Sequence, residues 1–286
     1  MGRMLNLAVL CFLLVAGTWC APRSLTAQTA DVALPDAPRA AVENAPQPAM
    51  ENKHVGDGTY FDGTVTWKGL PGRFGRDQKE IWLSPLQLAK GRGWIPTLVV
   101  VGGTAGLIEA DPHVMPYFRD HATNLDDLND VFDPLITTGE VVALPVVLLG
   151  AGYLRHDSYM TSTAMLAGEA YADSAIVDLA AKAVTRRQRP SDVPAGGDFT
   201  GTFFNGGKSP FKGSSFPSGH AAGVFSVATV VATRYKNHKW VPWATYGFAT
   251  AISLSRITTL AHFPSDVFLG AALGYTTTRF QVLRPE

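Results

Sequence analysis

Residues 159–187 hold the pattern that most restricts the fold of this chain, because apolar and small side chains recur there at helical spacing. The members of this stripe, three or four positions apart, are Met165, Gly168, Ala172, Ile176, Leu179 and Ala183. Positions at this spacing share one face of an α-helix, so the segment is predicted to be one long helix. Asp173 and Asp178 lie off the stripe and Glu169 borders it, which predicts a helix that is wet on one side.

Further helices of moderate length are predicted from residue 84 onward. Their expected ranges are 84–92, 95–108, 124–133, 139–154, 218–235, 241–256 and 265–279. Short apolar runs at Val100 and at Val141 are compatible with strands, but no alternation of apolar and polar residues accompanies them. The sequence therefore predicts an all-α fold.

The first 27 residues have the features of a secretory signal peptide. Arg3 precedes an apolar core that begins at Leu5, and small residues follow it. Cleavage can follow Cys20 or Ala27, and a retained N-terminal anchor stays open as the alternative. Both cysteines of the chain lie in this leader, so the mature protein has no thiol for disulfides, catalysis or metal binding. We expect an exported protein, periplasmic or secreted.

Residues 28–78 are predicted to be a disordered linker rich in Ala, Pro and Gly. Residues 21–50 alone contain nine Ala and five Pro, and they have no aromatic residue. Such a segment cannot bury enough apolar surface to offset the entropy lost on ordering. The folded domain is therefore expected to begin near Lys79 and to run to residue 286.

Charge and apolar run length limit the partners of this domain. The chain has 24 basic and 24 acidic residues, and this balance argues against a nucleic-acid binder, which should be basic. The predicted helices after the leader offer uncharged apolar runs of about 11–16 residues, shorter than the roughly 20 that a membrane span needs. A basic loop at 236–239 follows the positive-inside rule, however, so membrane association stays open as an alternative.

A basic cluster spans residues 182–190 at the end of the long predicted helix. Lys182 and Arg189 are seven positions apart, nearly two helical turns, so both are expected to point from one face. Pro190 is expected to stop the helix at Arg189. Taken alone, the cluster is also compatible with a solvated helix end whose cations complement the helix dipole.

The second cluster, Pro217 to His220, is typical of the start of a helix. Ser218 is expected near the cap, and Gly219 lets an anion approach the free amides of the first turn. His220 lies in that turn and can donate a proton to the same anion. The alternative is a capped helix whose histidine is simply solvated.

The third cluster spans Ser255 to Asp266. Asp266 follows His262 by four positions, within reach to fix the tautomer of the imidazole. Pro264 suits the first position of a helix. A purely structural bond between this His and Asp is the alternative.

Taken together, the three clusters describe a site for a phosphoryl group. Three cations, Lys182, Arg189 and Arg256, can compensate the equatorial oxygens, while one histidine attacks and the other protonates the leaving oxygen. No compact group of carboxylates suits Mg²⁺, so the positive charge is expected to come from side chains and not from a metal.

The string K-x6-RP, then PSGH, then SR-x5-H-x3-D resembles the three-part signature of the type 2 phosphatidic-acid phosphatase / vanadium haloperoxidase superfamily. The resemblance implies an all-helical bundle with the site at one end. It implies that His262 is a nucleophile forming a phosphohistidine, that Asp266 orients it, and that His220 is the general acid. The residues that it implies for phosphate binding are Lys182, Arg189, Ser218, Gly219 and Arg256.

The function predicted on this basis is a metal-independent phosphatase acting on phosphate monoesters or lipid (pyro)phosphates. No cofactor is expected, and vanadate should inhibit the enzyme. One alternative is a vanadium-dependent haloperoxidase, in which the same residues would hold vanadate as cofactor. A second alternative is a non-catalytic envelope protein that retains the fold. The expected partner is a phosphorylated small molecule or lipid, and a membrane surface stays open.

Three further segments carry weaker signals. Residues 191–216 contain six Gly and five Phe and are predicted to be a loop, with a mobile cover over the site and an insertion without a role as the two alternatives. The acidic stretch 125–133 fits a solvated amphipathic helix better than a calcium loop. Glu109, Asp111 and His113 fall in an expected loop and are assigned no role.

Overall fold

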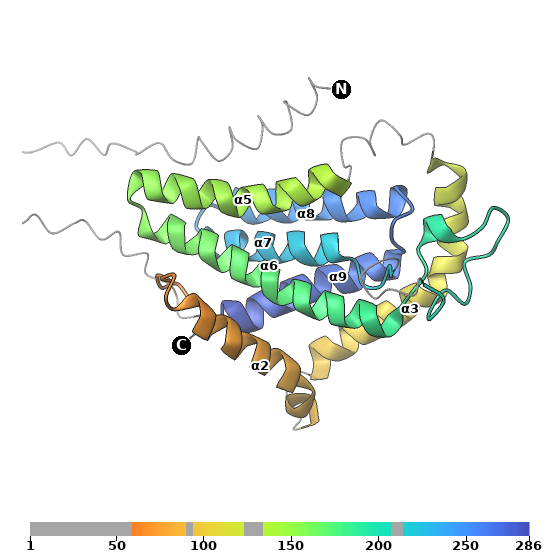
Figure 1. Cartoon of the computed structure of the whole chain (residues 1–286), viewed down its shortest axis with the longest axis horizontal. Coiled ribbons are helices and arrows are strands. Elements are labelled where there is room, and N and C mark those ends of the chain that lie inside the picture. The colour runs from red at the N-terminus through yellow and green to blue at the C-terminus, as the bar shows by residue number, and fades with distance from the viewer. Residues whose placement is uncertain (1–58, 90–93, 123–133, 207–213, 286) are drawn as a thin grey trace, which may run out of the picture. The chain divides into compact units, whose positions relative to one another are not determined.

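The computed structural model describes residues 59–89, 94–122, 134–206 and 214–285, and every regular element in these ranges is helical. The all-α prediction is confirmed. The helices, shown in Figure 1, are α2 (Leu70–Ala89), α3 (Trp94–Asp120), α5 (Pro134–Arg155), α6 (Ser158–Thr185), α7 (Gly219–Arg234), α8 (Trp240–Thr258) and α9 (Pro264–Thr277), with a 3-10 turn at Pro190–Asp192 and a π-helical turn at Thr278–Val282.

Several helices extend beyond their predicted ends. α3 does not stop at residue 108 but continues to Asp120 through two interior prolines, Pro112 and Pro116. A proline inside a helix removes one backbone hydrogen bond, but this half of α3 buries Met115 completely, and that packing compensates. The helix predicted at 124–133 and the acidic stretch within it lie outside the described residues.

The packed domain begins earlier than predicted. Tyr60 and Val65 are buried in the main hydrophobic core, and the amide of Phe61 donates to the carbonyl oxygen of Leu283 at 2.8 Å. The prediction that a disordered linker reaches residue 78 is therefore wrong for residues 59–78, which include the first turns of α2. Single aromatic and branched side chains anchor this segment, and such isolated anchors leave no periodic pattern in the sequence. The predicted leader and the remainder of the linker lie outside the described residues.

Helix α7 is central to the bundle, since it packs against α6, α8 and α9 (Figure 1). An added Cβ at Gly270 of α9 would lie 2.4 Å from the carbonyl oxygen of Ser218, and one at Gly274 would lie 2.1 Å from that of Ala222. The two glycines therefore let the backbones of α7 and α9 approach directly. Ser218 lies against Gly270, and Ala222, four positions later, lies against Gly274, also four positions later. The two helices therefore run parallel, and their N-termini lie at the same end.

The interpretation of α6 is right about its helicity but wrong about its buried face. Asp173 and Asp178 are buried, whereas Ile176 and Leu179 are 38% and 43% exposed. Side chains of other residues donate to the buried carboxylates. Gln78 of α2 donates to Asp173 at 2.8 Å, for example. Burial of a carboxylate is tolerated only with such partners, and a hydrophobic pattern cannot reveal them.

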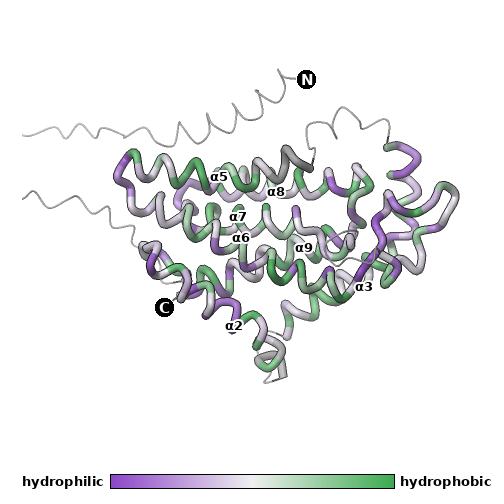
Figure 2. Tube along the Cα trace, viewed as in Figure 1, coloured by the Kyte–Doolittle hydropathy of each residue, from purple (hydrophilic) through white to green (hydrophobic). Residues whose placement is uncertain are grey.

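Within the described ranges, no helix has both the length and the apolar character that crossing a membrane requires. Hydrophobic residues run along α5 (Figure 2). Large apolar side chains are also exposed on the first half of α3, including Ile95, Leu98 and Val99.

Candidate active site

The C-terminal end of α6 carries the first cluster. The helix ends at Thr185, four residues earlier than expected. Arg186 adopts a left-handed conformation with φ 42°, and its backbone amide donates to the carbonyl oxygen of Lys182. Arg189 therefore lies beyond the helix, in extended backbone, and the prediction that it shares a helix face with Lys182 is wrong. The amide of Ser191 donates to the carbonyl oxygen of Leu260 at 2.9 Å, which ties this cluster to the third one.

The N-terminus of α7 carries the second cluster. Ser218 is the N-cap, and its hydroxyl accepts the amide of Ala221 at 3.4 Å, as the sequence predicts. Gly219 is the first helical residue, and a Cβ there would lie 3.0 Å from Lys182 Nζ. The side chain of Lys182 thus lies directly beside the first turn of α7, which needs a glycine at this point. His220, the second residue of the helix, is partly buried.

Helix α8 ends in a reversal that returns the chain to the site. Leu260 has a φ of 55°, in the left-handed region, and the amides of Ala261 and His262 both donate to the carbonyl oxygen of Arg256. The side chain of Arg256 is completely buried, and its Nε and Nη2 donate to Ser255 Oγ at 3.1 and 2.9 Å. The third cluster is therefore a helix end that holds Arg256 and His262 together.

The imidazole of His262 is buried and its tautomer follows from its contacts. Nδ1 lies 2.7 Å from the carbonyl oxygen of Ser215 and 3.7 Å from Oδ2 of Asp266. Since a carbonyl oxygen only accepts, Nδ1 carries the proton and donates it, and Nε2 keeps its lone pair. The expectation that Asp266 fixes this tautomer is corrected in part, because the hydrogen bond goes to Ser215 and the carboxylate lies further away.

Burial and neighbouring charges set the protonation of this pair. Burial lowers the pKa of His262, Asp266 opposes that effect, and the cations Lys182 and Arg189 lower it further. Burial alone would raise the pKa of Asp266, but its contacts with His262 and Arg187 outweigh burial and hold the pKa below its ordinary value. At neutral pH the site therefore holds a neutral imidazole beside an ionised carboxylate.

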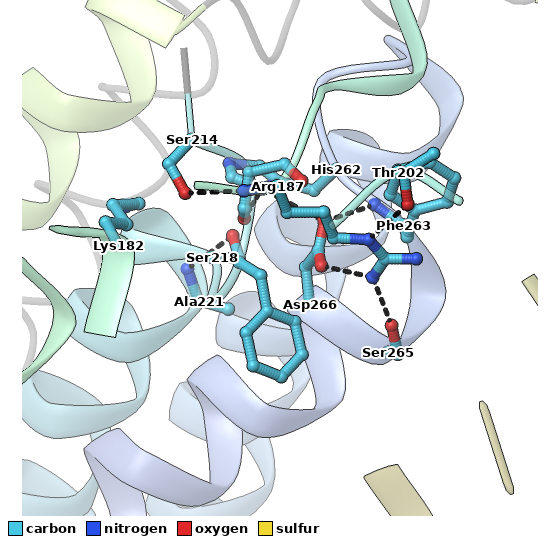
Figure 3. Close-up of polar contacts among 12 residues, drawn as sticks. Lys182, Arg187, Thr202, Ser214, Ser218, Ala221, His262, Phe263, Ser265 and Asp266 are labelled. Atoms are coloured by element: carbon cyan, nitrogen blue, oxygen red, sulfur yellow. Dashed lines mark hydrogen bonds and ion pairs between the residues drawn. The ribbon is translucent and has the colours of Figure 1, made fainter. Parts of the chain in front are cut away.

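Arg187 is the centre of the polar network beneath this pair (Figure 3). Its side chain is buried, and Nη1 donates to Asp266 Oδ1 and to Ser265 Oγ, both at 2.7 Å. Nη2 donates to Asp111 Oδ2 at 2.7 Å, and Nε donates to Thr202 Oγ1 at 3.0 Å. The guanidinium thus links four separate segments of the chain and compensates two buried carboxylates at once.

Aromatic rings from the loop and from α9's N-cap enclose the same guanidinium. Its central carbon lies 3.8 Å from the ring centroid of Phe263, 4.5 Å from that of Phe203 and 5.9 Å from that of Phe216. Four residues of the 191–216 loop are therefore packed into the base of the site: Thr202, Phe203, Ser215 and Phe216. The mobile-cover interpretation is wrong for these four, since they hold Arg187 and, through Ser215, His262.

A second carboxylate lies beside Lys182, one of the cations predicted to bind phosphate. Asp178 Oδ2 accepts from Lys182 Nζ at 2.6 Å, and the side chain of Asp178 is 7% exposed. Burial raises the pKa of Asp178, and the nearby Lys182 opposes that rise. Asp178 positions the lysine beside the start of α7. The described residues contain no group of three or more His, Cys, Asp or Glu side chains arranged to hold a metal ion.

Residues 163–284, which contain all three clusters, match the family model of the PAP2 superfamily. This part of the chain is similar to the PAP2 superfamily. The lipid A 1-phosphatase of Porphyromonas gingivalis is 40% identical over 62 residues, which are 21% of this chain and 14% of that protein. The chain thus matches about a seventh of that relative's length. The crystal structure of a transmembrane phosphatidylglycerolphosphate phosphatase of PAP2 type from Bacillus subtilis aligns with a TM-score of 0.39 and 19% identity, over 72% of this chain and 94% of that one.

Sequence reasoning missed three residues around the candidate site. Asp111, expected in a loop without a role, lies in α3, is completely buried and contacts both Arg187 and Ser265. Glu109 and His113 lie in the same helix and not in a loop. Arg187 lies inside the first cluster and Asp178 just before it. One signal was available for each: an extra arginine within the cluster, and an acid four positions before Lys182.

Proposed function

We propose that the protein is a metal-independent phosphatase that hydrolyses phosphate monoesters or lipid (pyro)phosphates through a phosphohistidine at His262. The observation that carries the proposal is the 2.7 Å contact of Nδ1 with the carbonyl oxygen of Ser215. It leaves Nε2 as an unprotonated nucleophile on a buried ring whose pKa is lowered. The match of residues 163–284 to the PAP2 superfamily supports phosphatase chemistry.

Cations and backbone amides around His262 would bind the phosphate oxygens. Lys182 lies beside the first turn of α7, where the amides that follow Ser218 point along the helix dipole. Arg256 lies at the helix end from which His262 follows. Arg189 acts on the same imidazole through its charge. Donors fixed in advance in a buried site stabilise the charge of a transition state without reorganising.

The reaction would proceed in two steps. Nε2 of His262 attacks phosphorus, an N–P bond forms, and the P–O bond to the leaving group breaks as His220 donates its proton to the leaving oxygen. Water then attacks phosphorus from the same side as the departed group and loses its proton to His220, while the N–P bond breaks and phosphate leaves. Asp266 would stabilise the positive charge on the imidazole in both steps.

The substrate class and location form part of the same proposal. A relative named lipid A 1-phosphatase supports a phosphorylated lipid as the substrate, and a membrane surface as the place where the substrate is met. Residues 1–27 would direct export as a signal peptide. Vanadate would bind in place of phosphate as an inhibitor, with no cofactor required.

Trapping the phosphoenzyme tests this proposal directly. Purified protein mixed with a ³²P-labelled phosphomonoester and quenched in alkali should retain label on His262, because phosphohistidine survives alkali. His262→Ala should retain none and should release no phosphate. His113→Ala is the control, since His113 is exposed on α3 and lies outside the site. Peroxide-dependent oxidation of halide by the vanadate-loaded protein, without phosphate release, would overturn the phosphatase in favour of a haloperoxidase.

A further inference from the structure

The buried face of α3 carries a carboxylate that the proposed mechanism does not use. Asp111 lies seven positions after Thr104 and four before Met115, and these three are the buried residues of α3. The side chain of Asp111 is completely buried, and a buried carboxylate is costly unless donors compensate it. Its charge therefore has to be matched by groups on other elements.

Donors on two other elements surround Asp111. Its Oδ1 accepts the backbone amide of Ser265 at 3.2 Å. Its Oδ2 accepts from the hydroxyl of Ser265 at 2.5 Å and from Nη2 of Arg187 at 2.7 Å. Burial raises the pKa of Asp111, while the contacts with Ser265 and Arg187 oppose that rise. Since both oxygens only accept, the contacts are those of an ionised carboxylate.

The amide contact makes Asp111 a cap for α9 that is supplied by another helix. The N-cap residue of α9 is Phe263, whose side chain cannot accept a hydrogen bond. Ser265 is the second residue of α9, where the backbone amide has no partner within the helix. Asp111 accepts that amide. The next residue, Asp266, is therefore fixed at its backbone through α3 and at its carboxylate by Arg187 (Figure 3).

The charges of this cluster leave one negative charge for His262. Arg187 pairs with Asp111 and with Asp266, both at 2.7 Å, so two carboxylates and one guanidinium carry a net charge of −1. In the proposed mechanism the imidazole becomes positive when it attacks phosphorus, and the cluster as a whole becomes neutral. Without Asp111 the same step would leave an uncompensated positive charge in a buried site, which is unfavourable.

We propose that Asp111 is a positioning residue for the reaction at His262, acting through Arg187 and through the first turn of α9. It balances Arg187, so the charge of Asp266 stays available to stabilise the positive imidazole. It also holds the backbone from which Asp266 extends. This inference rests on the proposed function, because a positive imidazole forms only if His262 attacks. It adds α3, which lies outside the matched residues 163–284, to the elements that support the chemistry.

Steady-state kinetics of Asp111→Asn test this role. Asparagine keeps an oxygen for the amide of Ser265 but removes the charge beside Arg187. We expect kcat to fall about 10- to 100-fold with KM changed less than about threefold, because Asp111 acts on the reacting ring and not on the bound substrate. Asp173→Asn is the matched control, since Asp173 is also completely buried but lies beside α2, and it should keep the wild-type kcat. Equal losses in both variants would overturn the proposal.

Titration of His262 gives a readout that does not depend on turnover. Proton NMR of Asp111→Asn should show a lower pKa for His262 than in the wild type, because Arg187 is left with a single carboxylate. Lys182 and Arg189 also act on this imidazole, but they are the same in both proteins. A slower Asp111→Asn variant with an unchanged His262 pKa would mean that Asp111 is merely structural, and would overturn the proposal.

Ser265→Ala keeps the inference testable if Asp111→Asn does not fold. It removes the hydroxyl that donates to Asp111 but keeps every charge, so kcat should fall about three- to tenfold, as for one lost hydrogen bond. Full turnover of Ser265→Ala would then overturn the proposal. A wild type that releases no phosphate, with a His262 pKa that still falls in Asp111→Asn, would overturn the phosphatase and leave the coupling of Asp111 to His262 standing.

Discussion

Arg187 Nη1 and Asp266 Oδ1 form a buried ion pair of 2.7 Å at the base of the active site. The other carboxylate oxygen of Asp266 accepts the amide of Phe263 at 2.8 Å. Both oxygens are therefore engaged, and the carboxylate is fixed 3.7 Å from Nδ1 of His262. The orientation of the proposed nucleophile thus depends on an arginine at a position that the first motif leaves unspecified.

Replacing Arg187 by lysine should slow turnover without weakening substrate binding. Lysine keeps the charge but cannot contact Asp111, Ser265 and Asp266 at once, so Asp266 loses its fixed position. We expect kcat to fall about 10- to 100-fold with KM changed less than about threefold. Steady-state kinetics measure this. Arg186→Lys is the control, because Arg186 is the adjacent residue and its side chain is exposed. Equal losses in both variants would contradict a positioning role.

The protonation of His262 should respond in opposite directions to its two kinds of neighbour. The imidazole Cε1 proton should titrate below the ordinary 6.5, because burial lowers the pKa. Arg189→Gln removes a cation and should raise that pKa, whereas Asp266→Asn removes an anion and should lower it. Proton NMR of the three proteins measures the shifts. Titration of the wild-type signal at or above 6.5 would contradict the neutral nucleophile.

Much of this site was predictable because its motif residues are local in sequence. Ser218 caps α7 and Pro264 begins α9 as the pattern indicates, since caps and first turns depend on adjacent residues. The contacts of Arg187 with Asp111 and Thr202 were not predictable, because residues 76 and 15 positions away supply them. The buried face of α6 was missed for the same reason, since Arg73 pairs with Glu169 across 96 positions.

Metal dependence separates the proposed mechanism from most other ways of hydrolysing phosphate esters. If Lys182, Arg189 and Arg256 supply the positive charge, EDTA should leave the rate of phosphate release unchanged. Orthovanadate should inhibit competitively, because its trigonal-bipyramidal adduct with His262 resembles the in-line transition state. Arg256→Ala should weaken inhibition and turnover together. Activity lost in EDTA and restored by Mg²⁺ or Zn²⁺ would rule out a mechanism based on cationic side chains alone.

Close packing of α7 on α9 should make Gly274 intolerant of any side chain. A Cβ there would lie 2.1 Å from a backbone oxygen of α7, so Gly274→Ala must push the helices apart. We expect a loss of about 1–3 kcal/mol in the free energy of unfolding. Gly247→Ala on α8, where an added Cβ meets nothing within 4 Å, should instead add up to about 1 kcal/mol through helix propensity. Thermal and urea unfolding measure both, and equal stability of the two variants would contradict this packing.

The carboxylates between α2 and α6 should make the fold less stable as the pH rises. Burial raises the pKa of Glu169 from 4.5 to about 7 and that of Asp173 from 3.8 to about 7. Between pH 4.5 and 7 the folded chain therefore holds protons that the unfolded chain has lost, so unfolding releases protons and rising pH favours it.

The free energy of unfolding should accordingly decrease across this pH window, by about 1–3 kcal/mol for Glu169 alone. Glu169→Gln cannot ionise and should flatten the decrease. Glu109→Gln, an exposed substitution of the same type on α3, should leave the slope unchanged. Urea unfolding at pH 5, 6, 7 and 8 measures the three slopes. A wild-type stability that rises with pH over this range would mean that Arg73 keeps Glu169 ionised in the folded protein, against the effect of burial.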